Sequence, residues 1–462
     1  MMNPFMFSRL VALSDGYIFG KREQFVEPTG ICIDSREVVA RTLFVSLKGE
    51  RTDGHLHIES ALQQGSCAVL VNRDWADCHL ESINNWSERY GAVFFPVDDT
   101  LKKMQLLAEN HRKRFTSMTI IGVTGSNGKT TSKEMIASIL GCYKPTYKNP
   151  GNLNSEIGLP LTVLRMKNVY DYAVLEMGIS HIGEMDVLAR IARPEIAIVT
   201  NIGRAHIGFM GSQRKIAEEK RKVFSFFDSD STAFIYENEG FGSILTEHLQ
   251  GNLKYFGEKS VEGLQEVRDR GLEGQELVFT DYTISLSLPG RHNLQNALAA
   301  ISVAQYLAVP PEFIQKGLSE MTAVFGRTEI LNGKVSVIQD CYNANPDSVL
   351  ASVKMAVSLP TKGRRILVLG DMLELGEESE AAHAALGSSL VSAKADQIFL
   401  FGPEMKAAAN TVLEEREDVV HCSDFQELKS RVLSYVKEGD LVLLKGSRGM
   451  ELERLTQELT RS

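Results

Sequence analysis

Residues 122–131, which read Gly-Val-Thr-Gly-Ser-Asn-Gly-Lys-Thr-Thr, have the composition of a phosphate-binding loop. Glycines let the backbone approach phosphate oxygens, and successive N–H groups at a helix N-terminus supply dipoles that bind anions. The Lys129 ammonium can reach the β- and γ-phosphates, and the Thr130 hydroxyl can ligate Mg²⁺. The usual pattern has glycine at position 123, where this chain has valine, so the loop is a variant that uses Gly122 and Gly125. A glycine-rich segment alone often forms only a turn. Here Gly-Lys-Thr lies between an apolar strand and an amphipathic helix, and this combination predicts nucleotide binding.

Two further side chains follow apolar runs of strand length, and in α/β sheets ligands bind where strands end. Glu176 lies in Ala-Val-Leu-Glu-Met-Gly at 173–178, and beside a phosphate loop it is expected to hold the metal. His206 lies just past the apolar run 196–199. Taken alone, each residue is more typical of a solvated strand edge or turn. Lys220 sits in Glu-Glu-Lys-Arg-Lys, which by pattern alone indicates a solvated helix face without function.

The elements that must position these residues can be predicted from hydrophobic periodicity. The phosphate loop lies between an apolar run at 118–124 and an amphipathic helical pattern for which Gly141 is the predicted C-cap. The apolar runs at 172–175 and 196–199 are continuous rather than alternating and are separated by helical segments. This arrangement is typical of a parallel sheet that is covered on both faces.

The length of 462 residues corresponds to about three domains at ordinary domain size. Before the phosphate loop, short strand-like pieces are followed by a helical stretch at 100–114; after residue 328 a second series of alternating strands and helices begins. The predicted strands of these outer units are 41–47, 67–71, 92–97, 335–338, 365–369, 397–401 and 441–444. The predicted fold is therefore α/β with domains at 1–115, 116–327 and 328–462.

Composition narrows the class of protein. With 50 Lys+Arg against 59 Asp+Glu the net charge is −9, which argues against a protein that acts chiefly by binding nucleic acid or anionic lipid. The six cysteines are scattered without a CxxC pair, so neither a zinc site nor a disulfide framework is indicated. No secretory signal pattern and no apolar run near the bilayer-spanning length of about 20 residues occur. We therefore expect a cytoplasmic protein without a membrane span or a nucleic-acid partner.

Considered together, the chemistry-bearing segments resemble those of the Mur ligase superfamily, ATP-dependent amide-forming enzymes of bacterial cell-wall synthesis. The similar segments, in family order, are 124–131, 151–160, 175–178, 200–206, 288–297, 326–327, 342–346, 370–376 and 445–448. Within the superfamily, Tyr-Asn-Ala-Asn-Pro, Gly-Asp-Met-Leu-Glu-Leu-Gly and Glu-Met-Gly look like the member that adds D-alanyl-D-alanine to UDP-N-acetylmuramoyl-tripeptide. The superfamily member that adds the third residue of the peptide commonly carries an Asp-Asn-Pro-Arg tetrapeptide, which is absent from this chain.

The resemblance implies an N-terminal α/β domain that holds the UDP-sugar, a central P-loop ATPase with a mostly parallel sheet, and a C-terminal Rossmann-like domain that holds the dipeptide. It implies an acyl-phosphate intermediate, with UDP-MurNAc-pentapeptide, ADP and phosphate as products. The implied cofactors are ATP, two Mg²⁺ ions and a CO₂-derived carbamate on Lys220. The expected state is a monomer.

Residue roles carry over from the resemblance one at a time. The residues implied to bind ATP are Thr124, Gly125, Ser126, Asn127, Gly128, Lys129, Thr130, Thr131, Asn293, Asn296, Arg327 and Asp340. The implied metal ligands are Thr130 and Glu176 for one ion, and His206 and carbamylated Lys220 for the other. The residues expected to act in catalysis are Lys129, Glu176, His206, Lys220 and Arg327.

The two substrates are implied to bind at the outer domains. For the UDP-substrate the candidates are Ser35, Arg36 and Asn154, with the segment 48–55 similar to a pyrophosphate site. For the dipeptide they are Asn343, Asn345, Lys445, Ser447 and Arg448, the last three being otherwise typical of a basic turn at a strand end. One departure occurs: the family often reads Asp-Asp-Ser-Tyr where this chain has Gln-Asp-Cys-Tyr at 339–342.

Three other functions are compatible with part of this pattern. Folylpolyglutamate synthase shares the phosphate loop, the histidine and the lysine, but the whole domain before the phosphate loop stands against it. A kinase or simple P-loop ATPase leaves the C-terminal unit unexplained. A nucleotide-dependent scaffold that has lost catalysis typically lacks the loop lysine or the metal ligands, all of which this chain retains.

Overall fold

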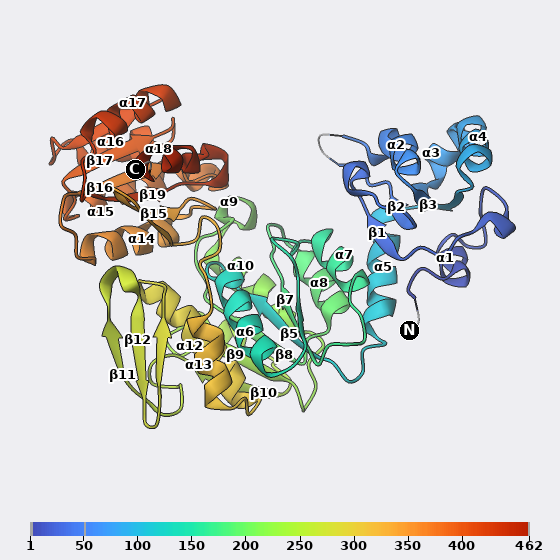
Figure 1. Ribbon diagram of the computed structural model, residues 1–462, viewed down its shortest axis with the longest axis horizontal. Helices are drawn as coiled ribbons and strands as arrows, with labels where there is room; N and C mark the ends of the chain where they lie inside the picture. The colour runs from blue at the N-terminus through green and yellow to red at the C-terminus, as the bar shows by residue number, and fades with distance from the viewer. Residues whose placement is uncertain (1–2, 50–51, 461–462) are drawn as a thin grey trace.

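The computed structural model describes residues 3–49 and 52–460. Its strands form sheets that belong to three α/β units, which follow one another along the chain. The first and last units stand apart on either side of the middle one (Figure 1). The predicted three-domain α/β architecture is confirmed, while the exact domain limits stay a prediction. In the segment 48–55, Glu50 and Arg51 lie outside the described residues.

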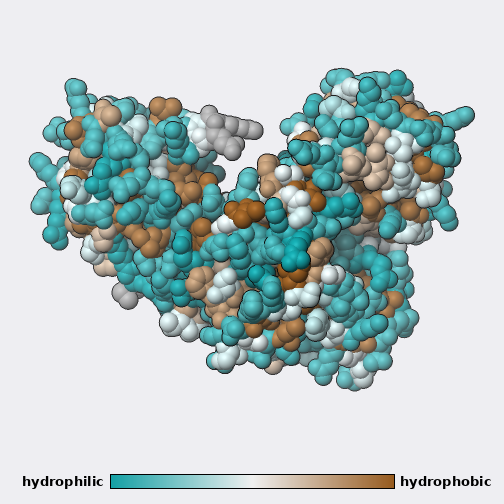
Figure 2. Space-filling view, turned by 180° about the vertical axis from the view of Figure 1, so that it is seen from behind, coloured by the Kyte–Doolittle hydropathy of each residue, from teal (hydrophilic) through white to brown (hydrophobic). Residues whose placement is uncertain are grey.

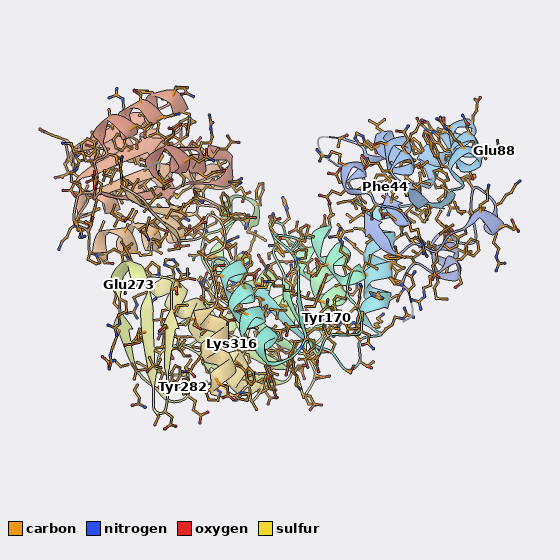
Figure 3. The ribbon with its side chains drawn as sticks, viewed as in Figure 1. Phe44, Glu88, Tyr170, Glu273, Tyr282 and Lys316 are labelled. Carbon is orange, nitrogen blue, oxygen red and sulfur yellow. The ribbon has the colours of Figure 1, made fainter. Side chains whose placement is uncertain are left out.

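The N-terminal domain is built on a parallel sheet of four strands in the order β1-β2-β3-β4. The strands are β1 (Gly30–Cys32), β2 (Thr42–Val45), β3 (Ser66–Asn72) and β4 (Val93–Val97), and the helices are α1 (Phe7–Leu13), α2 (Ile58–Gln63), α3 (Arg73–Cys78), α4 (Leu80–Tyr90) and α5 (Thr100–Arg112). Both faces are covered: Leu43 and Val45 pack with α1 and α5, whereas Phe44 packs with α2 to α4 (Figure 3). Helices on both faces explain why β2 is apolar throughout.

The central domain contains a parallel six-stranded sheet in the order β10-β9-β8-β5-β7-β6. Its strands are β5 (Thr119–Thr124), β6 (Thr146–Lys148), β7 (Tyr172–Glu176), β8 (Ile196–Val199), β9 (Thr232–Tyr236) and β10 (Asn252–Phe256). One face is covered mainly by α7 (Gly158–Leu164), α8 (Glu184–Ala192) and α10 (Gln213–Arg221), the other by α6 (Lys129–Tyr143), α12 (Arg291–Tyr306) and α13 (Pro311–Ser319). Short helices α9 (Ile207–Met210) and α11 (Gly242–Leu245) complete it.

The central domain differs from the sequence expectation at the end of one helix and in strands that were not predicted, which include β6, β9 and β10 of the main sheet. The prediction of Gly141 as a C-cap is wrong, because α6 continues to Tyr143, whose ring packs 5.3 Å from that of Phe313 on α13. An antiparallel sheet, β11 (Leu264–Asp269), β12 (Gln275–Phe279) and β13 (Thr283–Leu286), was not predicted. Tertiary packing extends the helix past the glycine, since glycine in a helix costs only about 1 kcal/mol.

The C-terminal domain has a six-stranded sheet in the order β14-β15-β19-β16-β17-β18, parallel except for the edge strand β14. Its strands are β14 (Glu329–Asn332), β15 (Ser336–Asp340), β16 (Arg365–Gly370), β17 (Gln397–Phe401), β18 (Val419–Cys422) and β19 (Leu441–Lys445). The helices are α14 (Pro346–Ser358), α15 (Ser379–Val391), α16 (Met405–Val412), α17 (Phe425–Tyr435) and α18 (Thr456–Thr460). The order predicts a ligand site at the carboxyl ends of the strands.

Helix α5 joins the N-terminal domain to the central one. Its buried apolar residues Met104, Leu107 and Ala108 belong to a hydrophobic core that also contains residues of β5, β7 and β8. The buried Arg112 guanidinium donates from Nε to the Ala192 carbonyl (2.7 Å) and from Nη2 to Glu195 Oε1 (2.7 Å). None of the helices in the described ranges is long and apolar enough to cross a membrane.

Candidate active site

The phosphate loop connects the end of β5 to the start of α6, as the sequence predicts. Gly125 and Gly128 have positive φ angles of 142° and 79°. A Cβ atom at Gly125 would collide with the Thr200 hydroxyl, and one at Gly128 would collide with the Asn296 side chain. Both glycines are therefore required by backbone conformation and by space.

Residues at the end of the neighbouring strand β8 hold the loop in place. The Thr200 hydroxyl donates to the Asn127 carbonyl (2.6 Å), and the Asn127 N–H donates to Asn201 Oδ1 (3.0 Å). The Gly203 N–H donates to Ser126 Oγ (2.8 Å). Because its hydrogen bonds lie within the protein, the loop is shaped before any nucleotide binds.

Lys129 folds back over this loop. Its ammonium donates to the carbonyls of Gly125 (2.9 Å) and Ser126 (3.1 Å). Burial lowers the pKa of Lys129, while the nearby Glu176 carboxylate acts in the opposite direction. A cation placed at the mouth of an anion-binding loop is suited to phosphate recognition.

Glu176, at the end of β7, faces the first helical turn after the loop. Its Oε1 accepts hydrogen bonds from Thr130 Oγ1 (3.1 Å) and Asn154 Nδ2 (2.7 Å). The side chain is 1% exposed, and among the described residues its Oε2 has no hydrogen-bond partner; the nearest cation is Lys133 Nζ at 3.6 Å. A buried carboxylate oxygen without a donor, beside a threonine hydroxyl, fits Mg²⁺, which prefers oxygen ligands.

A metal ion bound at this site would need ligands in addition to the protein side chains. Within residues 3–49 and 52–460, no group of three or more His, Cys, Asp or Glu is placed to hold a metal ion. Mg²⁺ is commonly bound by one or two carboxylates together with substrate phosphates. The donor set of Thr130 and Glu176 therefore fits an ion that arrives with a nucleotide.

His206 follows β8 in a left-handed conformation, with φ of 60°. Its Nδ1 lies 2.7 Å from Oε2 of Glu374, a residue of the C-terminal domain. The side chain lines the central cavity, so the sequence prediction that it stands near the phosphate loop agrees with its position. Glu374 itself was not assigned a role from the sequence, although its segment was part of the family resemblance.

Lys220 is buried rather than solvated, so the interpretation of a charged helix face is wrong. Helix α10 buries Ile216, Ala217, Glu219 and Lys220, because Glu219 Oε1 accepts hydrogen bonds from the backbone N–H groups of Gly183 (2.9 Å) and Met185 (3.1 Å) at the start of α8. Burial and the nearby positive charge of Lys129 lower the pKa of Lys220 well below its ordinary range. Its Nζ has no hydrogen bond or ion pair with any described residue.

The C-terminal domain contributes a second charged cluster at the ends of adjacent strands. Lys445, at the end of β19, lies opposite Asp340 at the end of β15, and its Nζ is 3.1 Å from Asp340 Oδ2. Lys445 also donates to the Asn343 carbonyl (2.7 Å). The Arg327 guanidinium stacks 4.2 Å from the centre of the Tyr342 ring, and its Nε is buried without a hydrogen-bond partner among the described residues.

Polar contacts join the C-terminal domain to the phosphate-loop region. Asn345 Nδ2 donates to Asn127 Oδ1 (2.7 Å), and the Arg204 N–H donates to Asp347 Oδ2 (2.7 Å). Together these elements enclose a cavity of about 520 Å³. Figure 2 shows the outer domains as separate lobes with a hollow between them, where hydrophilic and hydrophobic residues both lie at the surface.

Most of the predicted site residues line this one cavity. They are Ser126, Asn127, Gly128, Lys129, Thr130, Thr131, Asn154, Glu176, His206, Asn293, Asn296, Arg327, Asp340, Asn343, Asn345 and Lys445. Thr124, the last residue of β5, and Gly125, the loop residue that follows it, are buried. Asn154, which the resemblance assigned to the UDP-substrate, contacts the candidate metal carboxylate.

Other predicted residues lie outside the cavity lining. Ser447 Oγ accepts the Leu373 N–H (2.9 Å), and Arg448 pairs with Glu453. Ser35 and Arg36 lie in the N-terminal domain, where Arg36 Nε donates to Asp34 Oδ1 (2.9 Å). Sequence reasoning assigned no role to several residues that the structure adds to the site: Lys133, Asn201, His292, Tyr342, Asp347 and Glu374.

Comparisons with known proteins agree with this arrangement. Sequence profiles described as "Mur ligase family, catalytic domain", "Mur ligase middle domain" and "Mur ligase, glutamate ligase domain" match residues 27–112, 123–304 and 326–448. The UDP-N-acetylmuramoyl-tripeptide--D-alanyl-D-alanine ligase of Treponema pallidum is 37% identical over 428 residues, 92% of each chain. The chain belongs to the Mur ligase family.

Solved structures of related proteins have the same overall arrangement of domains as this Mur ligase. The crystal structure of MurF from Acinetobacter baumannii has a TM-score of 0.86 and 28% identity, with 99% of each chain covered. MurF from Thermotoga maritima in complex with ADP has a TM-score of 0.78 and 28% identity, and covers 95% of this Mur ligase and 98% of that chain. The likeness therefore extends over all three domains.

Proposed function

We propose that this Mur ligase joins D-alanyl-D-alanine to UDP-N-acetylmuramoyl-tripeptide in the synthesis of peptidoglycan precursor, converting ATP to ADP and phosphate. The relatives that carry this activity in their names match nearly the full chain. The observation that carries the proposal is one cavity in which the phosphate loop and Glu176 face Asp340 and Lys445 of another domain. Such a cavity can hold ATP beside an acceptor and a donor.

A carboxylate is a poor electrophile at neutral pH, so it must be activated. In the proposed reaction a carboxylate oxygen of the tripeptide attacks the γ-phosphorus and ADP leaves, which gives an acyl phosphate. The dipeptide amine, having lost one proton to become neutral, then attacks the acyl carbon; the nitrogen gives up a second proton, and phosphate leaves with the bonding electrons. Lys129 and the loop N–H groups hold the phosphates for this transfer, which depends mostly on positioning and charge.

The charges of the reactants set the main requirement. Two unit negative charges 4 Å apart repel by about 4 kcal/mol at an effective dielectric of 20. When bound, Mg²⁺ would neutralise charge on the transferring oxygens. Thr130 and Glu176 are proposed to hold one ion, and His206 with a modified Lys220 the other. The orphaned Glu176 oxygen supports the first assignment.

The environment of Lys220 supports a carbamate. Burial and the nearby positive charge of Lys129 lower the pKa of Lys220 well below its ordinary range, which favours the uncharged amine, the form that can attack CO₂. When the N–C bond forms, the nitrogen releases one proton, and the product is a carbamate whose anionic oxygens can ligate a cation. Among the described residues Nζ has no hydrogen-bond or ion-pair partner, so the nitrogen is available for this modification.

The remaining roles are proposed from the same geometry. Asn293, Asn296, Arg327 and Asp340 would contact the nucleotide; the first domain, with Ser35 and Arg36, would bind the UDP-substrate; and the C-terminal domain, with Asn343, Asn345, Lys445, Ser447 and Arg448, would bind the dipeptide. We also propose domain limits at residues 115 and 327, a monomer, and a location in the cytoplasm. Six unpaired cysteines agree with a reducing compartment.

The test measures phosphate release from Mg-ATP with UDP-MurNAc-tripeptide, with and without D-alanyl-D-alanine. We expect release that requires both substrates and a UDP-MurNAc-pentapeptide product by mass spectrometry. Phosphate release that depends on a folate or on another amino acid would mean that the protein is a ligase with a different substrate, such as the folylpolyglutamate synthase considered above. ATP binding without release would support the scaffold. Light scattering in the same buffer measures the oligomeric state.

A further inference from the structure

Glu374 and His206 face each other across the boundary between the central and C-terminal domains. His206 Nδ1 lies 2.7 Å from Glu374 Oε2, within the distance of a charge-assisted hydrogen bond. Nδ1 is buried and forms no aligned hydrogen bond with any residue that the structure describes, so the Glu374 carboxylate meets it as a close ion-pair partner. Glu374 is therefore the group placed to fix the orientation of the imidazole ring.

Both residues adopt a backbone conformation that side chains disfavour. The φ angle is 60° at His206 and 66° at Glu374. Such conformations persist where the surroundings over-determine them, and they concentrate at functional sites. Two residues held this way, in contact, and from different domains, indicate that their relative position matters.

The loop that carries Glu374 is held on both sides. The Met372 N–H donates to the buried His383 Nε2 (3.1 Å), and the Leu373 N–H donates to Ser447 Oγ (2.9 Å). The Glu374 carbonyl accepts the N–H of Gly208 on α9 (3.3 Å). A side chain at Gly208 would collide with the backbone at 374–376, so the two segments are packed closely.

The chemistry of histidine gives this contact a role. A histidine that binds a metal through one ring nitrogen almost always contacts a carboxylate, carbonyl or water through the other, which fixes its tautomer and orientation. A carboxylate at Nδ1 leaves Nε2 as the unprotonated nitrogen that can ligate a cation. Glu374 occupies the outer position of such an arrangement.

We propose that Glu374 is a positioning residue that orients His206 for its cation and so makes the second metal site depend on docking of the C-terminal domain. The inference rests on the proposed function in assigning a cation to His206. Because Glu374 belongs to the domain proposed to bind the dipeptide, the site is fully oriented only when that domain is in place. Metal affinity and domain closure are then coupled.

The experiment measures binding of Mn²⁺ to the full chain by electron paramagnetic resonance, with a non-hydrolysable ATP analogue and UDP-MurNAc-tripeptide present. We expect two Mn²⁺ ions in the wild type. Glu374→Ala should weaken the second ion by about 10–100-fold and leave the first unchanged. Glu374→Gln, which keeps an acceptor oxygen, should retain more affinity. The matched control is Glu377→Gln, an exposed residue of the same segment, which should bind both ions normally.

The His206→Ala variant separates the proposed metal role of His206 from the proposed positioning role of Glu374. If His206→Ala still binds two Mn²⁺ ions with wild-type affinity, the metal role in the proposed function is wrong. If His206→Ala loses the second ion but Glu374→Ala binds it as the wild type does, only the inference about Glu374 is wrong. An equal loss in Glu377→Gln would also overturn it, because the effect would then be one of general charge.

Discussion

The Asn345 side chain, at the start of α14, donates a hydrogen bond of 2.7 Å to Oδ1 of Asn127 in the phosphate loop. The same Asn345 caps its own helix by accepting the Ser348 N–H (3.0 Å). One amide therefore both begins a helix of the C-terminal domain and attaches that domain to the loop that would hold ATP. Binding at the loop and placement of the third domain are linked through this contact.

The two roles of Asn345 can be separated by a pair of variants. Serine is as good an N-cap as asparagine but is too short to reach Asn127, whereas alanine loses both interactions. We expect Asn345→Ser and Asn345→Ala to reduce the compaction that nucleotide and UDP-substrate produce in small-angle scattering. Only Asn345→Ala should also lose about 1 kcal/mol of unfolding free energy. Wild-type compaction in Asn345→Ser would contradict the link.

Lys220→Ala tests the proposed carbamate. Loss of an anionic ligand that offsets about 4 kcal/mol of repulsion should lower turnover about a thousandfold. Added formate or acetate should restore part of the activity, because a free carboxylate can occupy the vacated position. Lys215→Ala, on the exposed face of the same helix, should neither lose activity nor respond to the additives. A folded Lys220→Ala protein without any recovery would argue against the carbamate.

Lys133 is expected to stabilise the candidate metal carboxylate before a cation binds. Its buried ammonium donates to the carbonyls of Asn149 and Gly151 (both 3.1 Å) and lies 3.6 Å from Glu176 Oε2. Lys133→Met should cost about 3–5 kcal/mol of unfolding free energy in urea titrations, since it leaves buried charge unpaired. Lys148→Met, at an exposed ion pair, should cost at most about 1 kcal/mol. Adding Glu176→Gln to Lys133→Met should recover part of the loss.

His111 on α5 should make stability depend on pH. Burial lowers the pKa of His111 below its ordinary value of about 6.5, and its ring nitrogen Nε2 lies 3.2 Å from the Met166 carbonyl. The unfolded chain therefore binds the proton first as pH falls, so the free energy of unfolding decreases below about pH 6.5, by at most about 1.4 kcal/mol per pH unit. His111→Gln should lack this contribution, whereas His248→Asn, at an exposed site, should keep it. Identical pH profiles for wild type and His111→Gln would refute the assignment.

Glu374→Gly should separate stability from metal binding. Relief of the left-handed backbone is worth about 1–2 kcal/mol, while the added freedom of glycine in the unfolded chain costs about 0.5–1 kcal/mol. Chemical denaturation should therefore show an unchanged or higher unfolding free energy, while affinity for the second Mn²⁺ falls. A destabilised variant with normal Mn²⁺ binding would indicate a purely structural residue.

The phosphate loop and Glu176 were predictable from sequence because their signals are local. A glycine-rich segment between an apolar strand and a helix fixes its own conformation, and Glu176 ends a strand that pairs with β5 in register, Val123 opposite Glu176. Asp340 and Lys445 follow the same rule at the ends of paired strands. Parallel sheets bring such ends together, so the sequence positions sufficed.

Lys220 and Glu374 could not be predicted from residue patterns in the same way. Lys220 belongs to a highly charged segment, and only the capping of α8 by Glu219 turns that face inward. Glu374 meets His206 only through docking of one domain on another, which no local periodicity encodes. The antiparallel sheet β11–β13 and the edge strand β14 were missed because short amphipathic strands carry weak signals.

The shared core at α5 has a consequence for how the molecule melts. The N-terminal and central domains bury apolar side chains in one continuous cluster, whereas the C-terminal domain has clusters of its own. It meets its neighbour through polar contacts and through the partly buried Ile207 and Leu272. Differential scanning calorimetry should therefore show separate heat-absorption peaks for these two parts. Both tryptophans, Trp75 and Trp86, lie in the N-terminal domain, so tryptophan fluorescence would report unfolding of the N-terminal and central domains and would not detect unfolding of the C-terminal domain.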